Sequence, residues 1–392
     1  MRTLVKTGTL FTADGAVIER GWFTIENGRI GAVGRPGEAD GMDGLGETLD
    51  YGDCFVMPGL IDAHQHFSIS HGDRTDPLTV MEQLKQTPPR KVAKAILYLR
   101  QHVDAGETAA RSMGEDDFLD FELKRAIDEG YVVGPRISPC GAFLSPTHGH
   151  GQTGQTVSDG VEGMRKNARV NLAKGADLLK VFGSGGVVTG QVGLGFCTST
   201  REELRVAVEE AEMLGKYVAA HVHGGPGIDL CMDVGVRSLE HATMATDAQI
   251  ERMAKLGVWV TATFSPMAHP DGLRGLDPVK QARLESVKHT YDQVVAKLLE
   301  SGVKLCAGTD GVHGALWFEA ACLERCGASR EQALRIITVE GARSCRMEDR
   351  IGSIAPGRHA DFIALEKSPL EDLGNLRAPK AVYIGGRRVP AM

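Results

Sequence analysis

The chain has 392 residues, a formal net charge of −7, 42% hydrophobic residues and 24% charged residues. This composition is that of an ordinary folded protein, long enough for one large domain and a small one, and it excludes extensive disorder. Acidic and basic residues are interleaved, so no basic stripe predicts binding to nucleic acid or to an anionic membrane. A small-molecule substrate is therefore the expected partner.

Two further features bear on location and on cysteine chemistry. The N-terminal sequence MRTLVKTGTLFTADG lacks the apolar core of a signal peptide, and no stretch is apolar over the length of a membrane span, so we expect a cytoplasmic protein. The eight cysteines are scattered and never spaced as CxxC. This pattern indicates reduced, buried thiols rather than disulfides or a zinc–cysteine site.

Both ends of the chain have the pattern of small antiparallel sheets. Residues 1–57 contain short alternating segments divided by Asp-Gly, Asn-Gly and Pro-Gly turns, and residues 352–392 return to that pattern. Because a sheet needs partner strands, we expect the two ends to pair in one small β-sandwich domain, with the middle of the chain inserted between them.

Residues 58–351 alternate short apolar runs with amphipathic helical stretches. Eight runs are candidate strands: VMPGLIDAH, GETAARS, PRISPCGAF, ADLLKVFGSG, YVAAHVHG, VRSLEHA, VWVTATFS and VKLCAGTDG. After the fourth, REELRVAVEEAEMLGK places four apolar residues on one helical face: Leu204, Val208, Ala211 and Leu214. Eight strand–helix units over this length predict an α/β fold, the (β/α)8 TIM barrel. An open doubly wound sheet is the rival, but the first strand is not followed by its GxGxxG fingerprint.

Polar residues close five of these predicted strands, where the chemistry of such a barrel gathers. They are His64 and His66, Lys180, His221 and His223, His241, and Asp310. Each alone has a structural reading as a hydrogen-bonded core histidine, a lysine reaching solvent or an N-cap, but independent roles would scatter them along the chain. Residues two apart in a strand point the same way, so His64 and His66 leave together. Imidazole and carboxylate groups without cysteine predict a divalent cation, with Zn2+ preferred to Mn2+.

Lys180 is the exception in this set, because an ammonium group cannot ligate a cation. Desolvation near metal charge lowers the pKa of a lysine, and the neutral amine can add carbon dioxide to become an anionic carbamate with two oxygens. Such a group can bridge two metal ions.

Taken together, the chain resembles the amidohydrolase superfamily over nearly its whole length. The stretches that carry the resemblance are VMPGLIDAHQH, GADLLKVFGSGG, VAAHVHG, SLEHATMA, LCAGTDG and the tail GSIAPGRHADFIAL. It implies two divalent metal ions held by His64, His66 and Asp310 for the first, by His221 and His241 for the second, and by Lys180, as N6-carboxylysine, between them. A bridging hydroxide and a homo-oligomeric assembly are implied as well.

Within the superfamily, the chain is most similar to the imidazolonepropionase-related group that contains Xaa-Pro dipeptidases and carboxypeptidases acting on N-acyl amino acids. The stretch GPRISPCGAFLSPTHGHG resembles the third-strand loop of that group, with His150 in the position of its Gly-Gly-His-Gly histidine. His148 is additional, and His223 stands where a tyrosine is frequent. The loop FGSGGVVTGQVGLGFCTST departs from the acidic, proline-containing loop of the group.

The resemblance implies amide hydrolysis, by attack of the metal-bridging hydroxide, of an Xaa-Pro-like dipeptide or an N-acyl amino acid. Asp310 is the expected catalytic residue: it would orient the hydroxide, accept its proton and deliver that proton to the leaving amine. His223 would donate a hydrogen bond to the developing oxyanion or position the substrate. Asp62 and Glu240 are expected to support the ligands or to pack within the barrel.

Four further cationic or histidine side chains near the predicted mouth are candidates to bind a substrate carboxylate: His150, His148, His313 and Arg111. The alternatives are solvated loop histidines, and for Arg111 an ion pair with a neighbouring carboxylate.

Other functions remain open at this point. A cyclic amide hydrolase of the imidazolonepropionase type is the second reading, and the same metal hydroxide would attack lactones, carbamates or phosphotriesters. A non-catalytic scaffold member of the superfamily belongs to a different class. The presence of all six candidate ligands favours an enzyme over a scaffold.

Overall fold

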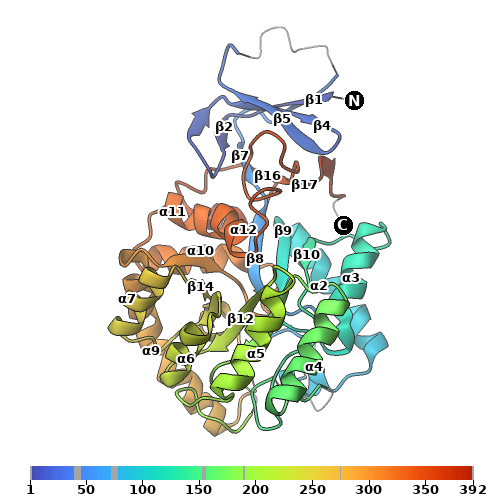
Figure 1. The fold of residues 1–392 in the computed structure, drawn as a ribbon. Helices are drawn as coiled ribbons and strands as arrows, with labels where there is room; N and C mark the ends of the chain where they lie inside the picture. Colours follow the sequence, from blue (N-terminus) through green and yellow to red (C-terminus); the bar gives the residue numbers. More distant parts are fainter. Residues whose placement is uncertain are drawn as a thin grey trace.

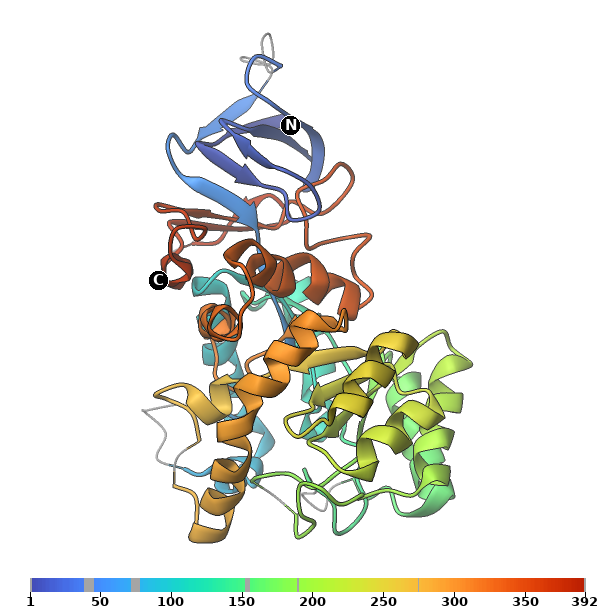
Figure 2. The ribbon, with the colours of Figure 1, turned by 90° about the vertical axis from the view of Figure 1, so that its left-hand side faces the viewer.

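The computed structural model describes residues 2–38, 46–71, 78–151, 156–188, 190–273 and 275–390. A small β-rich part, formed by the blue and red ends of the chain, lies beside a larger part in which helices surround parallel strands (Figures 1 and 2). Over these residues, no helix combines the length and the apolar character needed to cross a membrane.

Strands from the two ends of the chain share a sheet. β7 (Phe55–Pro58) pairs antiparallel with β16 (Phe362–Leu365) and parallel with β2 (Thr9–Phe11), within the order β18-β17-β16-β7-β2-β3. A four-stranded sheet has the order β5-β4-β1-β6. The remaining bounds are Arg2–Lys6 (β1), Val17–Glu19 (β3), Trp22–Glu26 (β4), Arg29–Gly34 (β5), Glu47–Asp50 (β6), Ala381–Ile384 (β17) and Arg387–Arg388 (β18). Phe23 of one sheet meets Phe362 of the other edge to face, with ring centroids 5.2 Å apart.

Eight further strands run parallel in two sheets of order β10-β9-β8 and β11-β12-β13-β14-β15. Their bounds are Leu60–Gln65 (β8), Glu107–Ser112 (β9), Arg136–Ser138 (β10), Leu178–Phe182 (β11), Tyr217–Val222 (β12), Ser238–His241 (β13), Trp259–Ala262 (β14) and Lys304–Ala307 (β15). Seven lie within one of the eight predicted runs and β8 extends one residue beyond its run, so these strand predictions are confirmed. Most of their residues are buried, as expected for parallel strands covered by helices.

Helices follow the strands and lie on the outside of the parallel sheets (Figures 1 and 2). α5 (Arg201–Glu212) begins with a capping box between Thr200 and Glu203. The other α-helices are Val80–Leu84 (α1), Pro88–Asp104 (α2), Leu119–Asp128 (α3), Gly160–Ala173 (α4), Pro226–Val234 (α6), Asp247–Leu256 (α7), Ser265–Ala268 (α8), Pro278–Glu300 (α9), Leu316–Arg325 (α10), Arg330–Arg335 (α11) and Gly341–Ser344 (α12). Two 3-10 helices lie at Asp116–Phe118 (η1) and Leu373–Arg377 (η3), and a π-helical turn lies at Ile336–Glu340 (η2).

The two parallel sheets contact each other at both edges. After β10, Leu144 forms a parallel bridge with Val181 of β11 and donates its N–H to the carbonyl of Lys180 at 3.0 Å. After β15, the N–H of Asp310 donates to the carbonyl of His64 at 2.9 Å. A Cβ atom at Gly308 would lie 2.4 Å from the backbone nitrogen of His64, so this approach of the two segments requires glycine.

A Gly308→Ala substitution is expected to destabilise the fold by about 1–3 kcal/mol, because the added methyl group forces the segment of Asp310 away from His64. Chemical denaturation measures this change. Gly195→Ala is the matched control, since a Cβ there meets no atom within 4 Å. Equal stability of the two variants would contradict the requirement for glycine at position 308.

Candidate metal centre

Six side chains predicted as metal ligands come from five different strands or from the residues just after them. They line one cavity of about 780 Å3, part of which is open to solvent: His64, His66, Lys180, His221, His241 and Asp310. The convergence follows from the parallel arrangement, because the carboxyl ends of neighbouring parallel strands meet at one side of the sheet.

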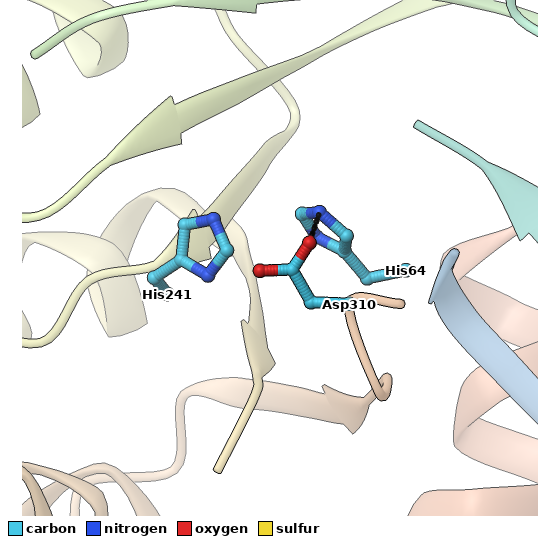
Figure 3. A group of neighbouring side chains, drawn as sticks. All are labelled: His64, His241 and Asp310. Atoms are coloured by element: carbon cyan, nitrogen blue, oxygen red, sulfur yellow. Dashed lines mark ion pairs between the residues drawn. The ribbon is translucent and has the colours of Figure 1, made fainter. Parts of the chain in front are cut away.

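Asp310 lies between the candidate ligands of β8 and β13 (Figure 3). Its Oδ1 is 3.4 Å from the Nε2 atoms of both His64 and His66. Ligand atoms of His64, His241 and Asp310 lie within 4.8 Å of one another. Since zinc–ligand bonds are about 2.0–2.2 Å long for nitrogen and oxygen, two ligands of one ion lie up to about 4 Å apart, and these three side chains fit a divalent cation after small shifts.

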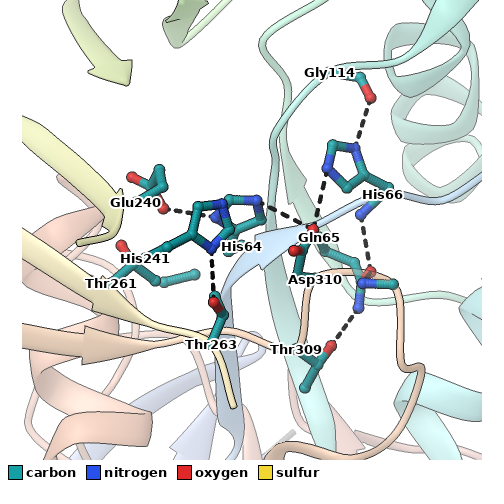
Figure 4. A network of polar contacts seen from close by, with 12 residues as sticks. His64, Gln65, His66, Gly114, Glu240, His241, Thr261, Thr263, Thr309 and Asp310 are labelled. Atoms are coloured by element: carbon teal, nitrogen blue, oxygen red, sulfur yellow. Dashed lines mark hydrogen bonds and ion pairs between the residues drawn. The ribbon is translucent and has the colours of Figure 1, made fainter. Parts of the chain in front are cut away.

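The other ring nitrogen of each of these histidines is held by a second group (Figure 4). Nδ1 of His64 lies 2.8 Å from Glu240 Oε2, and Nδ1 of His66 lies 3.0 Å from the carbonyl oxygen of Gly114. A carbonyl only accepts hydrogen bonds, so Nδ1 of His66 carries the proton and Nε2 offers its lone pair to the cavity. His241 is held in the same way by the Thr263 hydroxyl, at 2.7 Å. This is the arrangement that orients metal-binding imidazoles.

His221 completes the histidine cluster. Its ring centroid lies 4.7 Å from that of His241, and its Nε2 faces the Gly185 carbonyl at 3.3 Å. Nδ1 is therefore the nitrogen left to bind a metal ion. Burial is the main cause that lowers the pKa of His221 and of His241 well below the usual value, and neighbouring histidines lower it further. Both rings are therefore neutral, the form that binds a metal ion.

Lys180 lines the same cavity and is buried, with 2% of its surface exposed. Burial lowers the pKa of Lys180 to about 8, although Glu240 and Asp310 act in the opposite direction. Because burial disfavours the ammonium form, a larger fraction of this amine is neutral near pH 7 than for an exposed lysine. The neutral amine is the species that can react with carbon dioxide.

Arg111, predicted as a substrate-binding residue, is fully buried and is not among the residues that line the cavity, so its position favours the alternative expectation, an ion pair with a carboxylate. Its Nη2 is 3.0 Å from Glu240 Oε1, and its Nε donates to the carbonyl of Ala63 at 2.6 Å. The physical reason is that a guanidinium buried between the parallel strands needs a carboxylate as partner, because an unpaired charge there would be costly. Burial opposes the ionisation of Glu240, but Arg111 and His64 outweigh it and hold its pKa below the usual range. Glu240 supports a ligand, as expected.

Two predicted carboxylate-binding histidines also lie outside the cavity lining. His313 is directed back toward α2, where its ring stacks on Tyr98 with centroids 4.0 Å apart and its Nε2 lies 2.9 Å from the carbonyl oxygen of Ile69. Both nitrogens of this ring face protein atoms, so it has none to offer a substrate. His148 is exposed in the loop after β10. The positions of these two side chains do not support the predicted contact with a substrate.

His150 and His223 do line the cavity. The His150 ring centroid is 4.4 Å from that of His221, and a Cβ at Gly186 would come within 2.4 Å of the His150 ring. His223 lies with its ring 5.2 Å from that of His241 and its Nδ1 2.8 Å from the Thr243 hydroxyl. Burial lowers the pKa of His223 to about 3. It is therefore a neutral hydrogen-bonding group rather than a cation.

The sequence-based reading missed the apolar wall of the cavity and His71. The wall consists of Ile69, Val80, Leu84, Phe143, Val187, Val188, Pro266, Met267 and Leu273. Most of these residues lie in helices and loops beyond the strands, where hydrophobic periodicity gives no signal about which side chain faces a cavity. Over the described ranges, no guanidinium lines this cavity.

Glu319 of α10 holds the segment that carries Pro266 and Met267. Its carboxyl oxygens accept the N–H groups of Phe264 at 2.8 Å and Ser265 at 2.6 Å. Burial raises the pKa of Glu319 from 4.5 to about 8, although these hydrogen bonds oppose the shift. The carboxyl group is therefore largely protonated in the folded protein at neutral pH.

Comparison with known proteins adds one family match and three similar proteins. The model of the amidohydrolase family matches residues 55–389. The ochratoxinase of Aspergillus niger is 29% identical over 97% of this chain and 84% of that protein, and a crystal structure of it gives a TM-score of 0.88 at 28% identity, covering 99% of this chain and 95% of the other. The imidazolonepropionase of Geobacillus sp. (strain WCH70) is 25% identical over 89% of this chain and 84% of its own. A crystal structure of a Xaa-Pro dipeptidase with methionine bound in the active site gives a TM-score of 0.89 at 26% identity, with both chains fully covered.

Replacing Glu240 with Gln is expected to weaken metal binding by about 10- to 100-fold, because the amide has no charge to pair with Arg111 and its NH2 group faces a donor of Arg111 or His64 in place of an accepting oxygen, so the His64 ring loses its orientation. Metal titration of the chelator-treated protein measures the affinity. Glu210→Gln is the control. Glu210, on α5, is also buried and forms ion pairs with two arginines of α4. Equal affinities in the two variants would mean that Glu240 does not orient His64.

The raised pKa of Glu319 predicts a pH dependence of stability. The folded protein holds the Glu319 proton more tightly than the unfolded chain does. This difference contributes fully to the free energy of unfolding below about pH 4.5, and the contribution is lost as the pH rises toward 8. We expect the wild-type free energy of unfolding to fall over this interval and that of Glu319→Gln to fall less. Denaturation at several pH values tests this; parallel curves for the two proteins would refute it.

Proposed function

The chain belongs to the amidohydrolase family and is a hydrolase acting on amide C–N bonds, and on that premise we propose that it cleaves an N-acyl amino acid or an Xaa-Pro-like dipeptide at a centre for two metal ions. The observation that carries this proposal is the convergence of six candidate ligands on one cavity. A small molecule enters such a cavity, whereas a macromolecule would need an open surface.

The fold proposed for this activity is a closed (β/α)8 barrel formed by residues 58–351, with a β-sandwich domain formed by residues 1–57 and 352–392. The edge contacts Leu144–Val181 and His64–Asp310 support closure of the barrel. The contact of Phe23 with Phe362 supports the packing of the two terminal sheets. A cytoplasmic, homo-oligomeric protein completes the proposal, on the sequence and the family resemblance.

The proposed metal site contains two divalent cations, with zinc as the preferred ion. His64, His66 and Asp310 would hold one, His221 and His241 the other, and Lys180 as N6-carboxylysine would lie between them. Bound there, the cations would polarise the substrate carbonyl and lower the pKa of water.

Asp310 is the proposed acid–base residue of the reaction. Burial opposes its ionisation, but His64, His66 and His241 hold its pKa well below the usual range, so it enters the reaction as a carboxylate. It would accept the proton of the attacking water as the new C–O bond forms, and pass that proton to the amide nitrogen as the C–N bond breaks. The Thr243 hydroxyl would donate to Nδ1 of His223 and leave its Nε2–H for the carbonyl oxygen.

The lining of the cavity favours an N-acyl amino acid over a dipeptide with a free amino terminus. Apart from Asp310, no carboxylate lines the cavity in the part of the chain that the structure describes, so no group there pairs with an ammonium. The apolar wall suits an apolar acyl group. His150 is the candidate to bind the carboxylate of the released amino acid.

Hydrolysis of a cyclic amide is the second candidate function. Its support is the 25% identity to imidazolonepropionase over 89% of this chain. A ring opened by the same attack would need the same acid–base residue, so the two candidates differ only in the substrates turned over.

The test combines metal analysis with an activity panel. Protein purified in bicarbonate is expected to contain two zinc ions per chain and to hydrolyse N-acyl amino acids with apolar acyl groups faster than Xaa-Pro dipeptides, hydantoins or lactones. Asp310→Asn should fold normally and lose about 100- to 10,000-fold in kcat, whereas Asp128→Asn, on the exposed face of α3, should not.

Each other outcome has a distinct meaning. Turnover of hydantoins alone would favour the cyclic amide hydrolase. Protein that binds no metal after reconstitution and shows no turnover would refute the metal centre. An Asp310→Asn protein with unchanged biological activity would favour a scaffold.

A further inference from the structure

A series of hydrogen bonds runs through one buried and one partly buried histidine outside the cavity. Nδ1 of His102, on α2, faces the carboxylate of Glu107 at the start of β9. Nε2 of His102 lies 3.0 Å from Nδ1 of His313, and Nε2 of His313 lies 2.9 Å from the carbonyl oxygen of Ile69. None of the catalytic roles proposed above uses these groups.

The number of protons in this series of hydrogen bonds can be deduced from the groups at its two ends. The carbonyl of Ile69 only accepts, so Nε2 of His313 must carry a proton. If the His313 ring is neutral, its Nδ1 is bare, and Nε2 of His102 must donate to it. The contact between His102 and Glu107 then needs a third proton. Two neutral rings supply only two, so one additional proton resides in the series.

The additional proton belongs to His102. Glu107 accepts the N–H of Leu316 at 3.0 Å with its other oxygen, as an ionised carboxylate does. Burial disfavours an imidazolium at His102, but Glu107 and then Asp62 outweigh it and raise its pKa. Burial and the charge of His102 lower the pKa of His313 well below its usual value, so the His313 ring is neutral.

We propose that His102 is an imidazolium throughout the working pH range and that it positions the two loops that carry candidate metal ligands. Ile69 follows His66 by three residues, and His313 follows Asp310 by three, so the bond from His313 to Ile69 ties one loop to the other. The proton on His102 fixes the His313 ring in the form that makes this bond.

The imidazolium also lies beside two buried carboxyl groups. Atoms of Asp62, His102 and Glu107 lie within 4.8 Å of one another. The Asp62 carboxylate accepts the backbone N–H groups of His64 at 3.0 Å and Thr309 at 3.1 Å, next to the ligands themselves. A positive charge on His102 balances a carboxylate that holds both loops. The effect on catalysis rests on the proposed function, whereas the protonation state of His102 does not.

Two substitutions separate the effect of the proton from the effect of removing a side chain. In His102→Gln, the amide can donate to Glu107 and accept from His313, but His313 then lacks the proton for Ile69, and two carboxylates face each other without a cation. In Glu107→Gln, the amide itself donates to a neutral His102, every contact in the series keeps its proton, and the net charge of the cluster is unchanged. The hypothesis therefore predicts a smaller effect of Glu107→Gln, although it removes the carboxylate.

The first measurement is NMR of protein labelled with 15N-histidine, using His102→Gln to assign the signal. We expect both ring nitrogens of His102 to carry protons from about pH 6 to about pH 8.5, where an ordinary histidine loses its charge, and only one to do so in Glu107→Gln. A wild-type His102 with one protonated nitrogen would overturn the proposal, whatever the substrate of the enzyme.

The second measurement is metal affinity and, on the substrate found in the activity panel, kcat. We expect His102→Gln to lower both by about 10- to 100-fold, with a clearly smaller loss in Glu107→Gln. His289→Gln is the control, since that side chain is 80% exposed, and it should match the wild type. Equal losses in the two buried variants, or none in His102→Gln, would refute the positioning role. If no substrate is found, metal affinity alone decides.

Discussion

The contact between Arg111 and Glu240 is the interaction on which the candidate metal centre depends. A guanidinium and a carboxylate without solvent exposure are tolerated only as a pair, because either one alone would be a buried charge. The pair joins β9 to β13, and its carboxylate also holds Nδ1 of His64. One polar contact inside the strands thus fixes which nitrogen of His64 faces the cavity.

Buried hydrogen bonds also hold together the segments after β8 and β15. Gln65 donates to Thr309 and accepts from Gly311, while the Thr309 hydroxyl donates to Asp62 at 2.6 Å. Asp310 itself adopts a left-handed backbone conformation, with φ of 47°, and His241 does so with φ of 75°. Backbone in this region is costly for residues other than glycine, and the surrounding hydrogen bonds hold it there. The ligand atoms are therefore positioned by bonds between loops as much as by the strands.

The sequence predicts the strands well and selects six side chains that line one cavity, because both depend on local patterns. An apolar run that ends in a polar residue identifies a strand end, and parallel strands bring such ends together whatever the details of packing. The directions of Arg111 and His313 cannot be obtained in this way. Arg111 is the fifth residue of β9 and points inward toward a carboxylate four strands later in the chain, while His313 turns back to α2 to find His102. Both directions are set by partners more than a hundred residues away in the sequence.

Specificity lies beyond the reach of the same patterns for a related reason. The side chains proposed for chemistry sit at strand ends, whereas the apolar wall is assembled from α1, α8 and the loops after β8, β10 and β11. The bonds of Glu240, Gln65, Thr309 and the Ile69 carbonyl that position the segments of His64 and Asp310 do not use the side chains of the wall, so those side chains can differ without breaking the bonds. The similarity to an ochratoxinase, an imidazolonepropionase and an Xaa-Pro dipeptidase extends over most of this chain at similar identity, so the comparisons alone do not select one substrate. The apolar wall is the part of the cavity from which we expect that choice to be made.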